Sequence, residues 1–260
     1  MSDLSVGFIG VGAISSAIAT AILDRPEPAS VEVLLSPRSA ARSEALADRF
    51  PQAKLMPDNQ AVVDGSDIVM IAVLPSQVVE ICSTLRFRPD QIIVGVAAGW
   101  PPSQLRPLVA PAETVGQLIP LPMITLGVGP VVLYPSIPEV ETLLAGCGTL
   151  VVLEREEQVG VLSAGSSVMS SFFAFQNAAI EWIVSQGFDR AQAAGYVTSQ
   201  LHGLASESIA MDPAELPAAV EEHETPGGLN EQVRVALTDA GMFAALAGEL
   251  ERLYQERVRT

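Results

Sequence analysis

A short apolar segment at the amino end of the chain runs directly into glycines and a serine spaced as Gly10-x-Gly12-x-x-Ser15. Gly10 suits a tight turn, because a residue without a Cβ reverses the chain at little cost. Gly12 lets backbone N–H groups approach a phosphate, and the helix expected from Ala13 points its positive dipole end there. Ser15 is small enough for close helix–strand packing. The spacing predicts the pyrophosphate turn of a dinucleotide site, and a plain strand–turn–helix is the alternative.

The segment after the next expected strand, residues 31–35, indicates which dinucleotide is bound. NAD-binding units place a carboxylate near this point to bind the ribose 2′-hydroxyl, and this chain has none there. It has Ser36 and Arg38 instead, and a guanidinium can grip a 2′-phosphate that a carboxylate would repel. This pattern favours NADP(H). The alternative is that Arg38 is a solvated arginine at the start of the next helix.

Composition excludes several classes of function. The chain has 260 residues, a net charge of −16, 49% hydrophobic residues and only 17% charged residues. The acidic balance argues against binding to nucleic acid or to an anionic membrane. The apolar surplus indicates a large buried subunit interface. The longest uncharged runs, residues 118–134 and 162–180, contain Pro, Gly or polar residues, so neither is predicted to span a membrane, and the second is expected to be a buried helix.

The cysteines and histidines give no metal-binding pattern. Cys82, Cys147, His202 and His223 lie far apart in the sequence, with none of the spacings of a zinc site. No basic segment precedes the first apolar stretch, which glycines interrupt, so it does not resemble a signal peptide. We therefore expect no metal and a cytoplasmic location.

The first part of the chain alternates short apolar strands with helical patterns, which predicts a Rossmann domain with a doubly wound, mostly parallel sheet over residues 1–153. Strands are expected at 53–56, 67–73, 91–97, 114–119, 129–134 and 149–153. Cofactors bind at the carboxyl ends of such strands. The candidate cofactor-binding residues from this reasoning are Ile9, Gly10, Val11, Gly12, Ala13, Ile14, Ser36, Arg38, Ala72, Val73, Leu74, Pro75, Val96, Ala97 and Ala98.

The pattern changes at Glu154, and residues 154–260 are predicted to form an all-helical domain. Helices are expected at 154–186, 189–211, 215–222 and 230–257, with Asp189 as the N-cap of the second. Between the last two helices lies a Pro-Gly-Gly loop, residues 224–230, which exposes backbone N–H groups at a helix N-terminus. Taken alone, this loop reads as an ordinary interhelical turn.

With these segments placed, the chain resembles the pyrroline-5-carboxylate reductase family over nearly its whole length. The resemblance implies that Asn59, ahead of Ser66-Asp67, contacts the adenosine ribose. Its strength is that the motifs occur in the same order. The family's GFIGAGNMA, AVKPQ, SIAAGI, LSGSGPAY and TSPGGTT correspond to residues 7–15, 72–77, 95–100, 162–169 and 224–230.

The departures from the family pattern fall near its substrate. The family's RVMPNTPA becomes residues 117–124, so that Gln117, Leu121 and Pro122 replace Arg, Asn and Thr. The Lys of AVKPQ becomes Leu74, and the second Thr after Pro-Gly-Gly becomes Asn230. These changes bear on the identity of the substrate more than on the class of reaction.

The resemblance implies hydride transfer from NADPH to the C=N bond of a small cyclic imine carboxylate, and in particular reduction of 1-pyrroline-5-carboxylate in proline biosynthesis. It also implies a homodimer built through the helical domain, in which the loop faces a partner's nicotinamide. Two alternatives stay open: an NADP-dependent reductase acting on another imine or on a deazaflavin, and a catalytically weak NADPH-binding regulatory protein. The implied catalytic residues are Asn230 and Thr225, and the implied substrate-binding residues are Thr225, Gly227, Gly228, Leu229 and Asn230.

Overall fold

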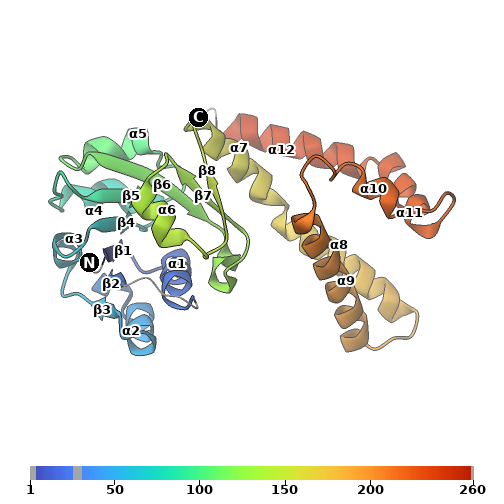
Figure 1. Cartoon of the computed structure of the whole chain (residues 1–260), viewed down its shortest axis with the longest axis horizontal. Helices are drawn as coiled ribbons and strands as arrows, with labels where there is room; N and C mark the ends of the chain where they lie inside the picture. Colours follow the sequence, from blue (N-terminus) through green and yellow to red (C-terminus); the bar gives the residue numbers. More distant parts are fainter. Residues whose placement is uncertain (1–3, 26–30, 259–260) are drawn as a thin grey trace. The chain divides into compact units, whose positions relative to one another are not determined.

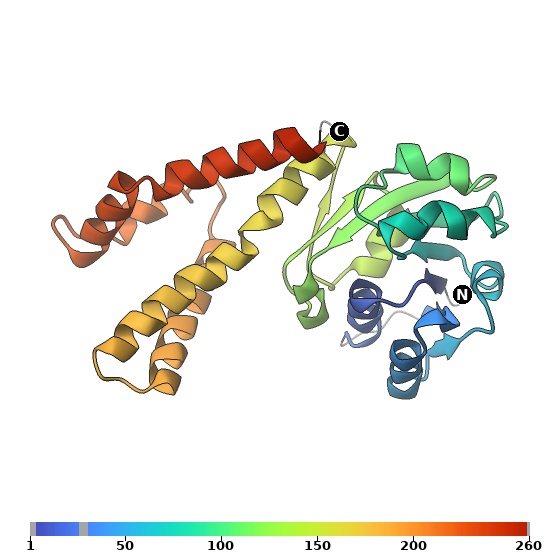
Figure 2. The same ribbon diagram turned by 180° about the vertical axis from the view of Figure 1, so that it is seen from behind.

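The computed structural model describes residues 4–25 and 31–258. The chain divides into two compact units, residues 1–159 and residues 160–260 (Figures 1 and 2). The boundary predicted after residue 153 lies at the end of the last strand, a few residues ahead of this division. We call the two units the nucleotide-binding unit and the helical unit, and describe each by itself.

The nucleotide-binding unit is built on one eight-stranded sheet with the order β3-β2-β1-β4-β5-β6-β7-β8. All neighbouring strands are parallel except β6 and β7, which are antiparallel. This architecture confirms the predicted Rossmann-type sheet, and its order reverses between β1 and β4, where such folds bind ligands. The strands are β1 (Leu4–Ile9), β2 (Val31–Leu35), β3 (Ala53–Leu55), β4 (Ile68–Ile71), β5 (Ile92–Gly95), β6 (Thr114–Pro120), β7 (Pro130–Tyr134) and β8 (Thr149–Val152).

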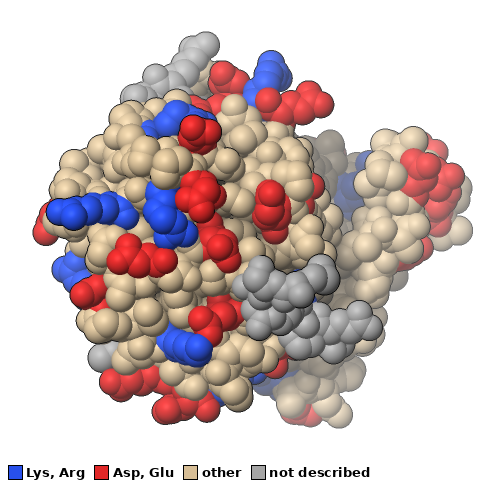
Figure 3. Space-filling model, turned by 60° about the vertical axis from the view of Figure 1, so that its left-hand side comes forward, with Lys and Arg blue, Asp and Glu red and all other residues tan. Residues whose placement is uncertain are grey.

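Helices cover both faces of the sheet (Figure 1). One face packs α1 (Ala13–Leu23), α2 (Ala40–Arg49) and α6 (Pro138–Leu144) into one core cluster. The other packs α3 (Asn59–Asp64), α4 (Val78–Ser83) and α5 (Pro102–Leu105) into a second. Strand β4 is buried along its whole length, as its unbroken apolar sequence requires. Figure 3 views this unit from one side, where basic and acidic side chains are interspersed and no basic patch forms.

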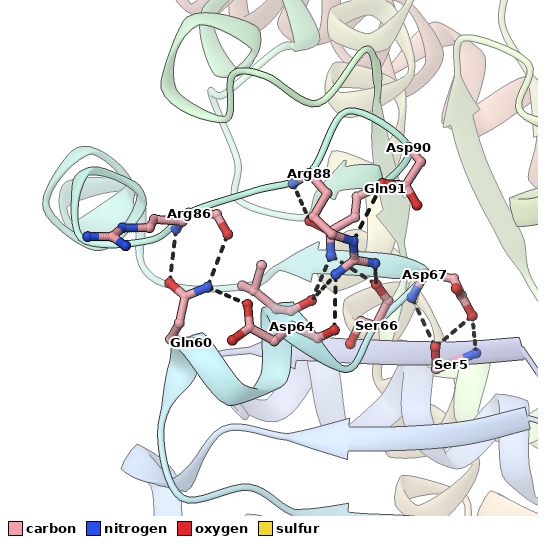
Figure 4. Close-up of polar contacts among 10 residues, drawn as sticks. Ser5, Gln60, Asp64, Ser66, Asp67, Arg86, Arg88, Asp90 and Gln91 are labelled. Carbon is pink, nitrogen blue, oxygen red and sulfur yellow. Dashed lines mark hydrogen bonds and ion pairs between the residues drawn. The ribbon is translucent and has the colours of Figure 1, made fainter.

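A polar network joins the amino ends of the central strands (Figure 4). Gln91 is 1% exposed, and its Nε2 donates to the carbonyl oxygens of Val63 and Ser66 at 2.6 and 2.9 Å. The Arg88 guanidinium donates to the Asp64 and Ser66 carbonyls at 3.0 Å each, while the Arg88 N–H donates to Gln91 Oε1 at 2.8 Å. These bonds satisfy carbonyl groups at and just beyond the end of α3, which have no intrahelical partner. The network therefore fixes the helix whose first residue is Asn59.

We expect Gln91→Ala to lower the free energy of unfolding of this unit by about 2–3 kcal/mol, because the Val63 and Ser66 carbonyls each lose one donor and the Arg88 N–H loses its acceptor. Asp90→Ala, at a 76% exposed carboxylate 3.5 Å from Arg88, should change it by less than about 0.5 kcal/mol. Both variants would be unfolded in urea in a Trp182→Phe background, where Trp100 is the one remaining tryptophan and its fluorescence reports on this unit. Equal effects of the two substitutions would contradict the assignment.

In the described part of the helical unit, two long helices pack against each other and three further helices follow them. Its first run is α7 (Glu157–Gly165), a short 3₁₀ turn (Ser166–Val168) and α8 (Met169–Ser185), and then come α9 (Arg190–Ala210), α10 (Ala219–Glu222), α11 (Leu229–Asp239) and α12 (Met242–Val258). Asp189 caps α9 as predicted, because its Oδ1 accepts from the N–H groups of Ala191 and Gln192 at 2.9 and 3.0 Å. Figure 2 shows α8 and α9 lying side by side.

Two expectations for this unit need correction. The helix expected over residues 230–257 is broken into α11 and α12, because Gly241 takes a φ of +80° that no helical residue adopts. The apolar run 162–180 is not buried within the chain: Phe172, Phe173 and Phe175 are all about half exposed or more. Apolar periodicity indicates that a face is covered, but it does not say whether the same chain covers it.

Candidate functional site

The first turn is held in a conformation that only glycine adopts easily. Gly10 has a φ of +92°, and a Cβ there would lie 2.8 Å from the Ala72 carbonyl oxygen at the end of β4. Any side chain at this position would push the two strand ends apart. The close contact of β1 with β4 is therefore built into the turn.

Two serines tie the turn to the elements on either side. The Gly10 N–H donates to Ser36 Oγ at 2.9 Å, and the Gly12 N–H donates to Ser15 Oγ at 2.8 Å. Ser36 is fully buried at the end of β2, and Ser15 is 2% exposed in the first turn of α1. Ser15 therefore does more than the sequence predicted, since it caps the helix as well as packing closely. Helix α1 begins at Ala13, and its N-terminus faces a cavity at the carboxyl edge of the sheet.

A cavity of about 570 Å³ lies at the carboxyl edge of the sheet. It brings together every predicted cofactor-binding residue except Ile9, whose side chain is fully buried in the second core cluster. It also includes Ser15 of the predicted turn, Gln77 at the end of the segment 72–77 that was expected beside the dinucleotide, and Ile81, which the sequence did not single out. Ile81 lies in α4, so the helix expected after Pro75 was the signal that could have found it. The cavity is lined by Gly10, Val11, Gly12, Ala13, Ile14, Ser15, Ser36, Arg38, Asn59, Ala72, Val73, Leu74, Pro75, Gln77, Ile81, Val96, Ala97 and Ala98.

The two ends of the cavity differ in chemistry. Ser36, Arg38 and Asn59 line the end beside β2 and α3, and Arg38 is solvent-exposed. Asn59 is placed by its neighbour Asp58, whose Oδ1 accepts from the Ala61 N–H at 2.7 Å and caps α3. The other end, beside β4 and β5, is lined by apolar residues and Gln77. With a pyrophosphate at the first turn, a phosphate-bearing ribose fits the Arg38 end and the nicotinamide fits the β4–β5 end.

Trp100 connects the two loops at the nicotinamide end. Its Nε1 donates to the Pro75 carbonyl oxygen at 2.9 Å, and its ring packs against the second core cluster. Gly99 precedes it with a φ of +76°, which turns the chain back toward the β4 loop. Pro75, Ala97 and their neighbours line the cavity, so this one hydrogen bond spans its edge.

The residues that depart from the family pattern are mostly apolar and accessible. Leu74 lines the cavity with 66% of its surface exposed, while Leu121 is half-buried and Pro122 is exposed. Gln117 is 4% exposed in β6, and its Oε1 has no hydrogen-bond partner among the described residues. Nothing in the structure explains the orphaned Gln117 oxygen.

The Pro-Gly-Gly loop lies in the helical unit and uses several of its own donors internally. The Gly228 N–H donates to the Thr225 carbonyl oxygen at 2.7 Å, and the Gly227 N–H donates to Glu231 Oε2 at 2.5 Å. The Asn230 Nδ2 donates to the His223 carbonyl oxygen at 2.8 Å. Leu229 is 81% exposed. The glycine amides predicted to hold a substrate anion are therefore already bonded within the loop.

Residues 4–25 and 31–258 contain no group of three or more His, Cys, Asp or Glu side chains that could hold a metal ion. Both cysteines are buried and free. Burial raises the pKa of the Cys82 thiol to about 11 and also raises the pKa of Cys147. Both side chains are therefore neutral thiols near pH 7 and act as core residues.

The fold and cavity define a Rossmann-type dinucleotide-binding protein. Residues 5–99 match a sequence family described as NADP oxidoreductase, coenzyme F420-dependent, a match that covers the strands around the cavity and less than half of the chain. The chain is an NADP-dependent oxidoreductase related to the pyrroline-5-carboxylate reductases. It is 25% identical to the enzyme of that name from Corynebacterium melassecola over 93% of each chain.

Solved structures of the same name share the fold. A 1-pyrroline-5-carboxylate reductase from Streptococcus pyogenes superposes with a TM-score of 0.81 at 20% identity, covering 99% of both chains. A pyrroline carboxylate reductase from Plasmodium falciparum, solved with NADP bound, gives a TM-score of 0.81 at 16% identity over 98% of this chain and 97% of that one. The predicted resemblance is confirmed over nearly the whole length.

We expect Trp100→Phe to weaken NADPH binding by about 3- to 10-fold, because the loop after β4 loses the hydrogen bond from Trp100 that joins it to the loop after β5. A change of this size corresponds to the loss of one hydrogen bond. Binding of 2′-phospho-ADP-ribose, which lacks the nicotinamide, should stay within about two-fold of the wild type. Isothermal titration calorimetry of both ligands measures this, with Trp182→Phe as the control. A parallel loss of affinity for both ligands would indicate general loosening of the fold instead.

Proposed function

We propose that this protein uses NADPH to reduce the C=N bond of a small cyclic imine, with 1-pyrroline-5-carboxylate, reduced to proline, as a substrate. The observation that carries the proposal is the cavity, in which a glycine turn, a helix N-terminus and Arg38 face one space. The relatives over nearly the full length support the substrate, because they bear the name pyrroline-5-carboxylate reductase.

The residues of the cavity fit the cofactor. Gly10 leaves room where a Cβ would collide with the β4 end, and α1 directs its N-terminus at the pyrophosphate position. When bound, NADPH supplies the hydride that adds to the imine carbon while the nitrogen gains a proton. An iminium carbon accepts hydride readily, so the protein has to position the reactants and exclude water. At the nicotinamide end, the apolar lining formed by Val73, Leu74 and Val96 is proposed to position the reactants and to exclude water.

Thr225 and Asn230 are proposed to orient the substrate, with Gly227, Gly228 and Leu229 forming the rest of the loop. The Asn230 amide has a second N–H and an oxygen beyond the bond it makes to His223, and these can bond the imine nitrogen or relay its proton. The Thr225 hydroxyl forms no hydrogen bond within the described ranges 4–25 and 31–258. Both side chains are exposed and accessible.

NADPH oxidation at 340 nm with 1-pyrroline-5-carboxylate tests the proposed function directly. We expect turnover that rises with enzyme concentration and yields proline, which chromatography identifies. Binding of NADPH without turnover would favour a regulatory role. Oxidation with a deazaflavin alone would place the protein with the other NADP oxidoreductases.

We expect Arg38→Ala to weaken NADPH binding by about 1.5–3 kcal/mol, because the 2′-phosphate loses a charge-assisted partner. NADH binding should not change, since NADH has no 2′-phosphate. Arg42→Ala, which removes a neighbouring exposed arginine in α2, is the matched control. Equal affinity of the wild type for NADPH and NADH would contradict the role given to Arg38.

We also propose that the helical unit binds a second copy of the chain, giving an obligate homodimer in the cytoplasm. The buried apolar residues in the described part of this unit are only Ile180, Ala193 and Val197, which is too small a core for such a unit alone. Residues Glu157–Ser185 are long and apolar enough to cross a membrane by length and composition, and none of the apolar 18-residue window within them is buried. A second copy is favoured because exposed apolar side chains also lie on α9, α11 and α12, and α12 carries charged residues that hydrocarbon would not accept.

We expect Phe173→Asp to shift the protein from dimer to monomer at micromolar concentration, because a carboxylate would be buried in the interface. Phe173 is 60% exposed in the single chain. Leu126→Asp is the matched control, since Leu126 is 76% exposed in the nucleotide-binding unit. Sedimentation velocity measures both variants, and a monomeric wild type would contradict the proposed assembly.

A further inference from the structure

The nicotinamide end of the cavity offers no ionic partner to a substrate. Arg38 is the single charged residue among the described residues that line the cavity, and it lies at the opposite end. The nicotinamide end is lined by Ala72, Val73, Leu74, Pro75, Gln77, Ile81, Val96, Ala97 and Ala98. A carboxylate brought here would lose hydration without gaining a charged donor, which is unfavourable. An apolar ring would gain from the same surroundings.

The Pro-Gly-Gly loop already binds a carboxylate of its own unit. Glu231 stands in the first turn of α11, and its Oε2 accepts from the Gly227 N–H at 2.5 Å. This side chain takes one loop amide and places a full negative charge beside the remaining first-turn amides of the helix. A substrate carboxylate at the same place would meet repulsion instead of the free helix N-terminus that binds anions elsewhere.

The cations around this loop are neutralised as well. The Arg234 guanidinium makes a bidentate pair with Glu224, with Nε and Nη2 at 2.5 and 2.9 Å from the two carboxylate oxygens. The His223 ring lies between the Ala219 carbonyl oxygen at 2.8 Å and Glu207 at 3.2 Å. Residues 221–231 contain four glutamates and neither lysine nor arginine. A field of this sign attracts a protonated, cationic iminium and disfavours a carboxylate.

These two independent observations point to a substrate class. We propose that the enzyme reduces small cyclic imines that carry no carboxylate at least about as well as 1-pyrroline-5-carboxylate, an inference that rests on the imine reduction proposed above. The hydride from NADPH adds to the imine carbon, a proton from water adds to the nitrogen, and the product is a cyclic secondary amine with NADP⁺. Glu231 is then a specificity-determining residue, because its carboxylate occupies the amide that an imine carboxylate would use.

The test compares two substrates that differ only in the carboxylate, 1-pyrroline and 1-pyrroline-5-carboxylate, with the full-length wild-type protein and saturating NADPH. We expect kcat/KM for 1-pyrroline to be within about 10-fold of the value for the carboxylate, or higher. A bound carboxylate with preorganised donors contributes charge-assisted hydrogen bonds, and losing them costs about 100-fold or more. A preference above about 10-fold for 1-pyrroline-5-carboxylate would overturn the inference and leave the proposed function intact.

Glu231→Gln removes the charge and keeps the shape, and glutamine at this helix position still supports capping. We expect it to raise the ratio of kcat/KM for 1-pyrroline-5-carboxylate to kcat/KM for 1-pyrroline by about 10-fold. Glu249→Gln, which removes a carboxylate paired with Arg252 on α12, is the matched control. Equal changes for both substrates would overturn the role of Glu231. No turnover of either imine by a wild type that binds NADPH would overturn the proposed function together with this inference.

Discussion

The nucleotide-binding unit depends on one close contact, in which the turn after β1 lies against the end of β4. Gly10 permits it, because a Cβ there would approach the Ala72 carbonyl oxygen to 2.8 Å. The Ala72 N–H in turn donates to the Ile9 carbonyl oxygen at 2.9 Å, so the two strand ends are joined directly. With β1 and β4 at this separation, the sheet order reverses between them and the cavity opens above the crevice. The position of the cavity therefore depends on a steric constraint at one residue.

Polar contacts then fix each element around this contact. Ser36 joins β2 to the turn, and the network of Gln91 and Arg88 holds α3 from the opposite edge of the sheet. Trp100 closes the other side of the cavity through the Pro75 carbonyl. These bonds hold the elements around the cavity in place, and a misplacement of about 1 Å is enough to slow a step such as hydride transfer.

The helical unit is organised differently, because most of its apolar surface remains exposed in the single chain. The nucleotide-binding unit buries two full core clusters, whereas the described part of the helical unit buries one of three residues. We propose that a second copy of the chain covers this surface and contributes to the stability of the unit. The acidic loop before α11 belongs to this unit, whereas the cavity belongs to the nucleotide-binding unit. On the function proposed above, selection among substrates is then separated along the chain from binding of the cofactor.

The sequence by itself determined the sheet, the turn and most of the cavity. Strand signals such as residues 67–73 are local, since a strand buried on both faces is apolar at every position. The glycine spacing is also local, because turn, phosphate approach and helix start occur within six residues. Only the tertiary structure decided the contacts between distant or competing groups. These are the hydrogen bond from Trp100 to the Pro75 carbonyl and the bond from the Gly227 N–H to Glu231, which occupies an amide that the loop sequence offered to a substrate. The break between α11 and α12 at Gly241 also became visible only in the folded chain. A sequence shows which donors exist, but only the folded chain shows which of them are already bonded.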